Sequence, residues 1–268
     1  MNHLLRPLAP ISDAGWKLLD DEARQRSVPA LAARKLVDFS GPHGWQHSAT
    51  NLGRSKPLAS APGEGVSGRQ RQVLPLVELR ADFILPLAQL RDADRGADDT
   101  DLQALDRAAH QIAVAENVAV FQGWPDVVTG IAEAAYEQAQ LGEDADGYPT
   151  QVASALDRLL GNGIVGPYGL ALGREQYQKV IETAEHGGYP LLEHLRKILE
   201  GPIVWAPGVD GAIVLSLRGG DFVFESGQDL SIGYESHDRE VVHLYLEESF
   251  SFHVATPEAA VALTPASL

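Results

Sequence analysis

The stretch Arg218-Gly219-Gly220-Asp221-Phe222, followed by Gln228-Asp229-Leu230-Ser231-Ile232-Gly233-Tyr234, is the most informative part of this sequence. It lies within a long C-terminal run of alternating β-forming residues, which predicts several consecutive strands. It offers no plausible nucleophile, metal-ligand cluster or phosphate-binding loop. A sheet-forming region without reactive groups indicates a surface made for contact, so assembly is the first hypothesis and catalysis the second.

Composition limits the class of protein. Of the 268 residues, 44% are hydrophobic and 22% charged, which predicts a folded chain rather than a disordered one. The absence of cysteine excludes disulfides, thiolate metal sites and a cysteine nucleophile. Residues 1–10 lack the apolar core of a signal peptide, and no apolar run approaches the roughly 18 residues that span a bilayer. We therefore expect a soluble, cytoplasmic protein without a membrane partner.

The charge balance argues against a nucleic-acid partner. The chain carries 21 Lys and Arg against 37 Asp and Glu, a net charge of −16. Sequence-independent binding of nucleic acid depends on Lys and Arg that neutralise phosphates. The acidity is otherwise explained by solubility alone.

Residues 48–72 predict a protruding arm. They are rich in Gly, Pro, Ser and Arg, with little apolar periodicity. Structureless segments beyond about 15 residues are unusual in a compact domain. A strong strand is expected directly afterwards, over residues 73–83. Such an arm is best explained if it lies on a neighbouring molecule.

The remaining pattern predicts an α+β fold. Ser12 and Asp13 are expected to cap a first helix. The acidic run 98–101 is expected to open the best helix as its first turn, and the apolar stripe of that helix runs from Leu102 towards Phe121, before residues 123–125 end it. Helices and a strand alternate over residues 149–199, and strands follow to residue 254. Strands at both ends of the chain suggest that the terminal segments pair in one domain.

Each motif that could support catalysis or ligand binding is weak. Residues 161–166 match G-x-G-x-x-G, but a helix is expected before them and a strand after them, the reverse of a dinucleotide site. Residues 236–238 read Ser-His-Asp, yet adjacent residues cannot form a triad, so a turn is expected. The aspartates at 92–101 and 144–146 lack the calcium-loop spacing. We therefore predict no catalytic residue, no cofactor and no metal site.

Two histidine pairs and one glutamate pair have the residue types of a zinc site and of an acid/base pair, but not the arrangement. His43 with His47, and His186 with His194, have no convincing third ligand for zinc in the sequence. Residues 247 and 248 are both glutamate, but in a strand their side chains face opposite sides and cannot act as an acid/base pair.

Short segments along the whole chain resemble the encapsulins, the linocin-type bacteriocin family of nanocompartment shell proteins. These segments are Leu8–Ile11, Gly41–Trp45, Pro75–Arg80, Gly166–Tyr168, Gly188–Leu191, Arg218–Phe222, Gln228–Tyr234 and Glu248–Phe252.

The resemblance implies the Hong Kong 97 phage capsid fold. It implies a peripheral domain with the N-terminal helix (1–44), an extended loop (45–73), a peripheral part with the long spine helix (74–122), an axial domain (123–218) and peripheral return strands (219–268). A closed icosahedral shell then needs about 60 copies of the chain or a multiple of that number.

The resemblance also implies a partner. Such shells enclose a cargo enzyme, usually a dye-decolourising peroxidase active in oxidative stress or a ferritin-like protein active in iron storage, through its terminal targeting peptide. By position, Arg34 and Asp38 match residues that contact this peptide, and Ile232 supplies part of an apolar floor. The alternative is that Arg34 and Asp38 merely pair with each other.

The loop Glu185-His186-Gly187-Gly188-Tyr189 matches the pore loop of the family at the five-fold axis. Its two glycines allow close approach of the backbone around an axis.

One departure and two alternatives remain. Some members hold flavin against a tryptophan where this chain has Ala88, so flavin binding is not expected here. A phage major capsid protein would share the fold. A hydrolase is the alternative from another class, because the bacteriocin label has attracted claims of lytic activity, although no residue set supports it.

Overall fold

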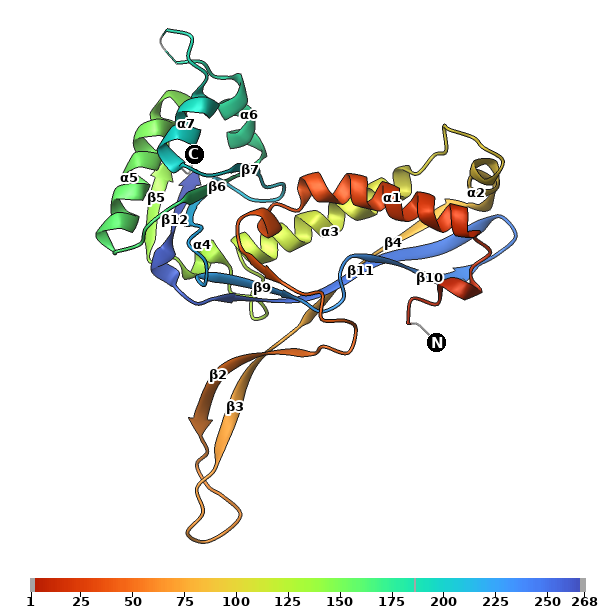
Figure 1. The fold of residues 1–268 in the computed structure, drawn as a ribbon, viewed down its shortest axis with the longest axis horizontal. Helices are drawn as coiled ribbons and strands as arrows, with labels where there is room; N and C mark the ends of the chain where they lie inside the picture. Colours follow the sequence, from red (N-terminus) through yellow and green to blue (C-terminus); the bar gives the residue numbers. More distant parts are fainter. Residues whose placement is uncertain (1–2, 186, 266–268) are drawn as a thin grey trace.

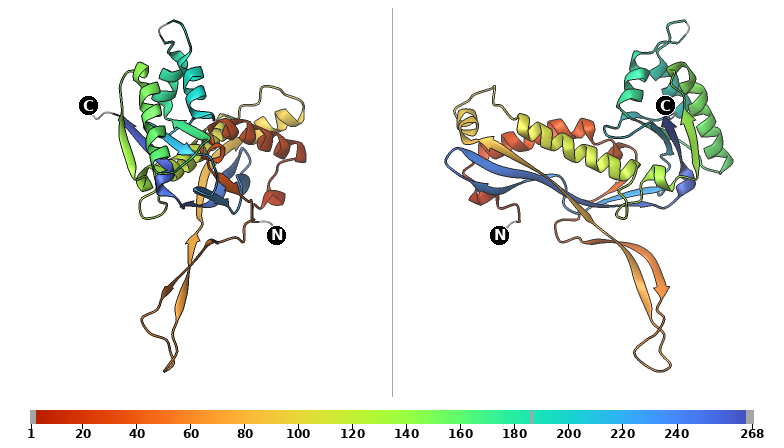
Figure 2. Two further views of the ribbon diagram at one scale, coloured as in Figure 1. Left: turned by 60° about the vertical axis from the view of Figure 1, so that its left-hand side comes forward. Right: turned by 180° about the vertical axis from the view of Figure 1, so that it is seen from behind.

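The chain forms a two-part body from which a narrow arm projects (Figure 1). The computed structural model describes residues 3–185 and 187–265. One part is built on a sheet covered by long helices, and the other on a second sheet with shorter helices around it (Figures 1 and 2). No helix within the described ranges is long and apolar enough to cross a membrane.

The first sheet joins segments that are far apart in the sequence. Its order is β1-β9-β11-β10, and β4 pairs with β11. The strands are β1 (Asp38–Ser40), β4 (Val77–Pro86), β9 (Phe222–Ser226), β10 (Ser231–His237) and β11 (Val241–Val254). The 14-residue β11 pairs antiparallel with β4, β10 and β9, and therefore organises the sheet.

Two long helices, α1 (Asp13–Ala30) and α3 (Gln103–Phe121), cover one face of this sheet (Figure 1). The predicted cap of α1 is confirmed, since the Ser12 hydroxyl accepts a hydrogen bond from the Gly15 amide at 2.9 Å. The stripe predicted for α3 is also confirmed: Leu105, Ala109 and Ile112 are buried. The predicted start is wrong, because α3 begins at Gln103 and the acidic run 98–101 lies before the helix. Shorter elements here are α2 (Leu87–Asp94), η1 (Arg6–Leu8) and η2 (Ala33–Lys35).

The second sheet has the order β5-β12-β8-β6-β7. Its strands are β5 (Glu137–Leu141), β6 (Tyr168–Leu172), β7 (Ile203–Trp205), β8 (Ala212–Ser216) and β12 (Ala260–Pro265). Around it lie α4 (Ile131–Ala134), η3 (Ala145–Gly147), α5 (Tyr148–Gly161), α6 (Arg174–Glu182), α7 (Leu191–Leu199) and η4 (Pro257–Ala259). Every residue of β6 and β8 is buried, as expected for central strands.

The last strand does not follow the expected domain plan. Residues 219–268 were expected to return to the peripheral sheet, and β9, β10 and β11 do so. After the turn at η4, however, β12 pairs with β5 and β8 of the second sheet. The four residues Ala260–Leu263 are buried there. A β-forming pattern predicts a strand but does not specify the sheet that the strand joins.

The arm is a two-stranded sheet of β2 (Ala49–Pro57) and β3 (Arg69–Pro75) that projects away from the body (Figures 1 and 2). It contains most of residues 45–73, the segment expected to form the extended loop. Its base is held by a 2.6 Å hydrogen bond between the hydroxyls of Thr50 and Ser251. Within β2 and β3 every residue is exposed or half-buried.

Candidate functional site

A groove of about 270 Å³ lies between α1 and the strands β10 and β11. Ala23 and Ser27 lie one turn apart and place one wall on α1, and Leu31, directly after the helix, extends that wall. Ile232 and Leu246 line the opposite side and are each only 1% exposed, so they form a fixed apolar floor.

Arg34 closes one end of the groove and is held by three carboxylates. Its guanidinium donates to Glu116 Oε2 at 2.7 Å, to Glu248 Oε2 at 2.5 Å and to Asp229 Oδ1 at 2.6 Å. The side chains of Glu116 and Glu248 are 0% and 1% exposed. Arg34 also lies over the rings of Phe39 and Phe224, at 5.2 and 5.5 Å. The guanidinium is therefore fixed in place by the fold.

Burial dominates the electrostatics of this cluster. It raises the pKa of Glu116 and of Glu248, because a carboxylate loses hydration there; Arg34 opposes the rise at both carboxyls. Burial lowers the pKa of Arg34, but Glu116 and Glu248 outweigh that effect and the pKa stays above its ordinary value. The second oxygen of each buried glutamate has no hydrogen-bond partner among the described residues.

The structure brings together two of the three residues expected to contact a cargo peptide. Arg34 and Ile232 line the same groove. Asp38 lines a separate pocket of about 150 Å³, and its carboxylate accepts a hydrogen bond from the Gly220 amide at 2.6 Å. The alternative, a simple Arg34–Asp38 pair, is wrong, because the recorded partners of the two side chains are different.

The loop expected to line a pore is a tight turn between α6 and α7. The Glu185 amide donates to the Tyr189 carbonyl at 2.9 Å, and the Gly188 amide donates to the Glu185 carbonyl at the same distance. Gly187 and Gly188 have φ of +100° and +79°, a conformation that other residues rarely adopt. His186 lies outside the described residues.

Contacts to α7 hold both sides of this loop. Glu185 Oε1 lies 2.8 Å from Nδ1 of His194. The Lys197 ammonium lies 4.9 Å from the centre of the Tyr189 ring. The loop conformation is thus supported by side chains as well as by its glycines.

The weak motifs lie in ordinary helices, strands and turns. Gly161 is the last residue of α5, with β6 following, so the order is helix then strand. The turn expected over residues 236–238 is present only in part, because Ser236 and His237 belong to β10. Asp238 closes the turn that follows, since its Oδ1 accepts hydrogen bonds from the amides at 240 and 241. Among the described residues no group of three or more His, Asp or Glu side chains could hold a metal ion. Glu247 and Glu248 have different partners, His3 and Arg34.

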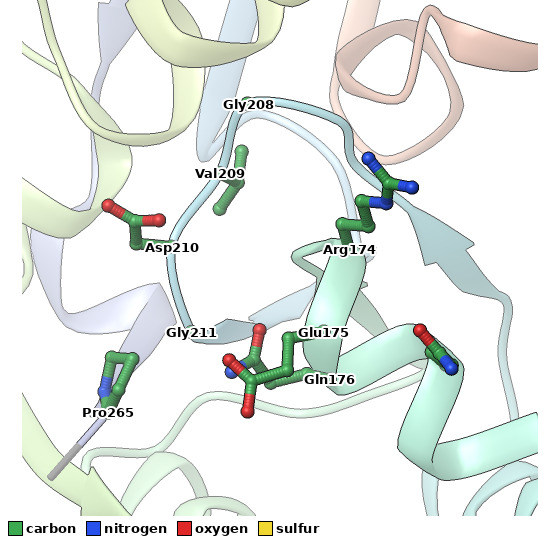
Figure 3. Close-up of a pocket in the computed structure, with 9 residues that line it drawn as sticks. Arg174, Glu175, Gln176, Gly208, Val209, Asp210, Gly211 and Pro265 are labelled. Atoms are coloured by element: carbon green, nitrogen blue, oxygen red, sulfur yellow. The ribbon is translucent and has the colours of Figure 1, made fainter.

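A further pocket, of about 390 Å³, lies between the start of α6 and the turn at residues 208–211 (Figure 3). Arg174 and Asp210 lie on opposite sides of it (Figure 3). No ion pair is recorded between them, and the rest of the lining is mainly glycine, glutamine and proline. These side chains form a polar surface without an arrangement that indicates chemistry.

Sequence reasoning missed Glu116 and Glu248 as part of the groove. One signal was available: Glu116 lies in the apolar run 112–121 of α3, where a charged residue needs a buried partner. The partner could not be identified, because Arg34 is 82 residues away in the sequence.

The arrangement of body and arm defines a class of protein, the subunit of a capsid-like shell. The virus-like particle from Pyrococcus furiosus superposes with a TM-score of 0.65 at 19% identity, covering 94% of this chain and 98% of that chain. At that identity the likeness shows the fold alone. It confirms the Hong Kong 97-type capsid fold that the sequence resemblance implies.

Sequence relatives identify the family. The family model described as "Encapsulating protein for peroxidase" matches residues 1–251. A type 1 encapsulin shell protein of Rhodospirillum rubrum is 48% identical, covering 98% of this chain and 96% of the relative. One of Rhodococcus erythropolis is 43% identical, covering 98% and 100%. The chain belongs to the type 1 encapsulin shell-protein family, which favours a nanocompartment over a phage capsid.

Proposed function

We propose that this chain is a structural subunit that assembles in the cytoplasm into an icosahedral shell of about 60 copies or a multiple. The shell encloses a cargo enzyme that carries a terminal targeting peptide. The description of the matching family favours a peroxidase as cargo. The alternative cargo is a ferritin-like protein.

The arm is the observation that carries the assembly proposal. A two-stranded hairpin is at best marginally stable by itself in water. This arm nevertheless exposes large apolar side chains, with Leu58 at 47%, Val66 at 63% and Val73 at 50%. A surface on another subunit would cover these side chains and complete the hairpin.

Charge supports the same conclusion. The net charge of residues 45–73 is +3, from the four cations Arg54, Lys56, Arg69 and Arg71 and the single anion Glu64. Because the whole chain has a net charge of −16, the residues outside this segment have a net charge of −19. None of the four cations has a carboxylate within ion-pair distance among the described residues. A cationic arm is therefore complementary to the anionic body of a neighbouring copy.

Native mass spectrometry and electron microscopy of the purified protein test assembly directly. We expect closed particles of megadalton mass. A stable monomer as the main species at micromolar concentration would overturn the proposal.

For cargo, the groove beside α1 is the proposed docking site on the inner surface. It combines a fixed apolar floor with an exposed apolar side chain, Val28, which is 53% exposed. A peptide in extended conformation could cover Val28 and reach the floor at Ile232.

A pair of variants tests docking. Val28→Glu places a charge in the groove at an exposed helix position, so we expect assembled shells that fail to load cargo. Gln25→Glu adds the same charge at an exposed position of α1 outside the groove lining and should load normally. The reporter is a fluorescent protein fused to the last dozen residues of the enzyme encoded beside this gene. Equal loading of both variants would reject the groove.

Ile232→Asp is a poor test of the same idea. Ile232 is 1% exposed and packs within the core beneath α1. A buried unpaired carboxylate there would destabilise the subunit itself.

For the loop Glu185–Tyr189, with His186 outside the described residues, we propose a place at a symmetry axis where it lines a pore for small solutes. The support is the pair of glycines at positive φ and the anchoring of the loop to α7.

A further inference from the structure

Three of the four charged side chains that line the groove already take part in ion pairs within the fold. Asp20 pairs with Arg6 through two hydrogen bonds of 2.9 and 2.6 Å. Arg34 and Asp229 pair with each other at 2.6 Å. None of these three side chains needs a partner from a bound peptide.

Arg24 is the exception. It lines the groove from the exposed face of α1 and has no carboxylate within ion-pair distance among the described residues. The neighbouring carboxylate on the helix, Asp21, is held by the Lys17 ammonium at 2.5 Å, and the more distant charge of Arg24 adds to the lowering of its pKa. The groove therefore presents one positive charge that lies outside the ion pairs of the described residues, in a chain whose net charge is −16.

We propose that the peptide bound in this groove carries an aspartate or glutamate side chain that pairs with Arg24. This inference rests on the proposed function, because it specifies the chemistry of the peptide that docks there. Apolar residues on either side of the acidic one would cover Val28 and the floor at Ile232. The fit is one of charge complementarity: a cation that is not held in an ion pair favours an anion.

The position of Arg24 favours a side chain over the end of a peptide. Along α1, Asp20 lies one turn before Arg24, while Val28 and Leu31 follow one and two turns after it, and all four line the groove. A terminal carboxylate at Arg24 would end the peptide halfway along the groove and leave Val28 or Asp20 uncovered.

The same geometry gives Arg34 a different role. Because three carboxylates already hold its guanidinium, it contributes shape at the end of the groove and little charge selection. Selection by charge is therefore assigned to Arg24 rather than to Arg34, the residue that the sequence indicated.

A selection inside cells tests the assignment on intact shells. A fluorescent protein carrying a randomised 12-residue C-terminal tail is co-expressed with the chain, particles are purified, and the tails of enclosed reporters are sequenced. The chain is used as wild type, Arg24→Glu, Arg24→Gln, and Arg107→Glu as a control for the same charge change at an exposed position on α3. Electron microscopy verifies that each variant forms particles.

We expect wild-type shells to enrich apolar tails with an acidic residue at one position. If the ion pair with Arg24 is exposed to solvent, acidic residues at that position should be enriched by about fivefold or less. Exclusion of water from the groove would strengthen the pair and raise this enrichment. Arg24→Glu should reverse the preference to lysine or arginine at that position, Arg24→Gln should abolish it, and Arg107→Glu should match wild type.

The outcomes separate the two proposals. If apolar tails are enriched but the charge preference is the same in wild type and both Arg24 variants, the role of Arg24 is refuted and the groove stands. If wild-type shells enrich no tail, docking in the groove fails, and the inference about Arg24 fails with it. If Arg24→Glu does not form particles, Arg24→Gln alone decides.

Discussion

Replacing Arg34 with leucine should destabilise the subunit by about 3–5 kcal/mol at neutral pH, because removing one partner of a buried ion pair leaves the other uncompensated. Leucine keeps part of the volume and removes the charge. Glu116 and Glu248 would then face each other, 0% and 1% exposed, without the guanidinium that links them.

The magnitude follows from the protonation that the variant requires. A carboxyl with an ordinary pKa of about 4.3 is neutralised at pH 7 at a cost of about 3.7 kcal/mol, since each pH unit corresponds to about 1.36 kcal/mol. Burial raises the pKa of both glutamates in the native protein, and Arg34 opposes that rise at both carboxyls. Loss of Arg34 removes this opposition and favours the neutral form of a buried carboxyl.

The pH dependence has a definite sign. A carboxyl whose pKa is raised in the folded state contributes stability below its unfolded pKa and loses that contribution as the pH rises through the folded pKa. The deficit of Arg34→Leu should therefore be largest at pH 8 and fall to about 1 kcal/mol at pH 5, because neutralising a carboxyl of ordinary pKa costs only about that much at this lower pH. Adding Glu248→Gln, which removes one buried charge, should recover part of the deficit at pH 8.

The assay is thermal unfolding of assembled particles at one scan rate between pH 5 and pH 8. A loss of 3–5 kcal/mol lowers the midpoint by roughly 10 °C in a chain of this size. Arg107→Leu, at an exposed position, is the control and should change stability by less than about 0.5 kcal/mol. A deficit below about 1 kcal/mol for Arg34→Leu, or one that does not change with pH, would show that the cluster is not electrostatically coupled.

Three further changes are informative. Arg69→Glu with Arg71→Glu should lower the yield of closed particles in sucrose gradients, because it reverses the charge of the arm. Added salt should weaken wild-type assembly, because screening reduces the attraction between arm and body. Salt-independent assembly of both proteins would contradict this. Gly187→Val with Gly188→Val should slow entry of a small chromogenic substrate to an enclosed peroxidase, and unchanged uptake by intact particles would reject the pore assignment. Asn117→Leu should lower the free energy of unfolding by about 2–4 kcal/mol, because the buried side-chain amide of Asn117 accepts from two backbone N–H groups and donates to one carbonyl at the end of α1, at 2.8 to 3.1 Å. A loss below about 1 kcal/mol would mean that those backbone groups find other partners.

The sequence predicted the groove only in part. Arg34 and Ile232 line one groove, and their contact with a cargo peptide, implied by the resemblance to a family, stays a prediction. Asp38 was expected there too, but its carboxylate is used at Gly220, where the chain enters β9. Arg24 was overlooked, because an exposed arginine on a helix is common and its significance depends on which carboxylates lie nearby.

Local order was determined by the sequence itself. The Ser12 cap, the apolar stripe of α3, the glycine- and proline-rich arm and the turn at Asp238 all depend on residues within a few positions of one another. Their energetics are set by backbone conformation and by spacing along one element, so a single sequence is enough to predict them. The same local signals indicated a β-rich C-terminal segment, including the Arg218–Tyr234 stretch.

The tertiary structure alone decided which elements meet. It placed β12 in the second sheet, joined Glu248 to Arg34 across 214 residues of sequence, and engaged every charged side chain of the groove lining except Arg24 in an ion pair. The free energy of a buried charge depends on what packs around it in space, and that is known only after the chain has folded.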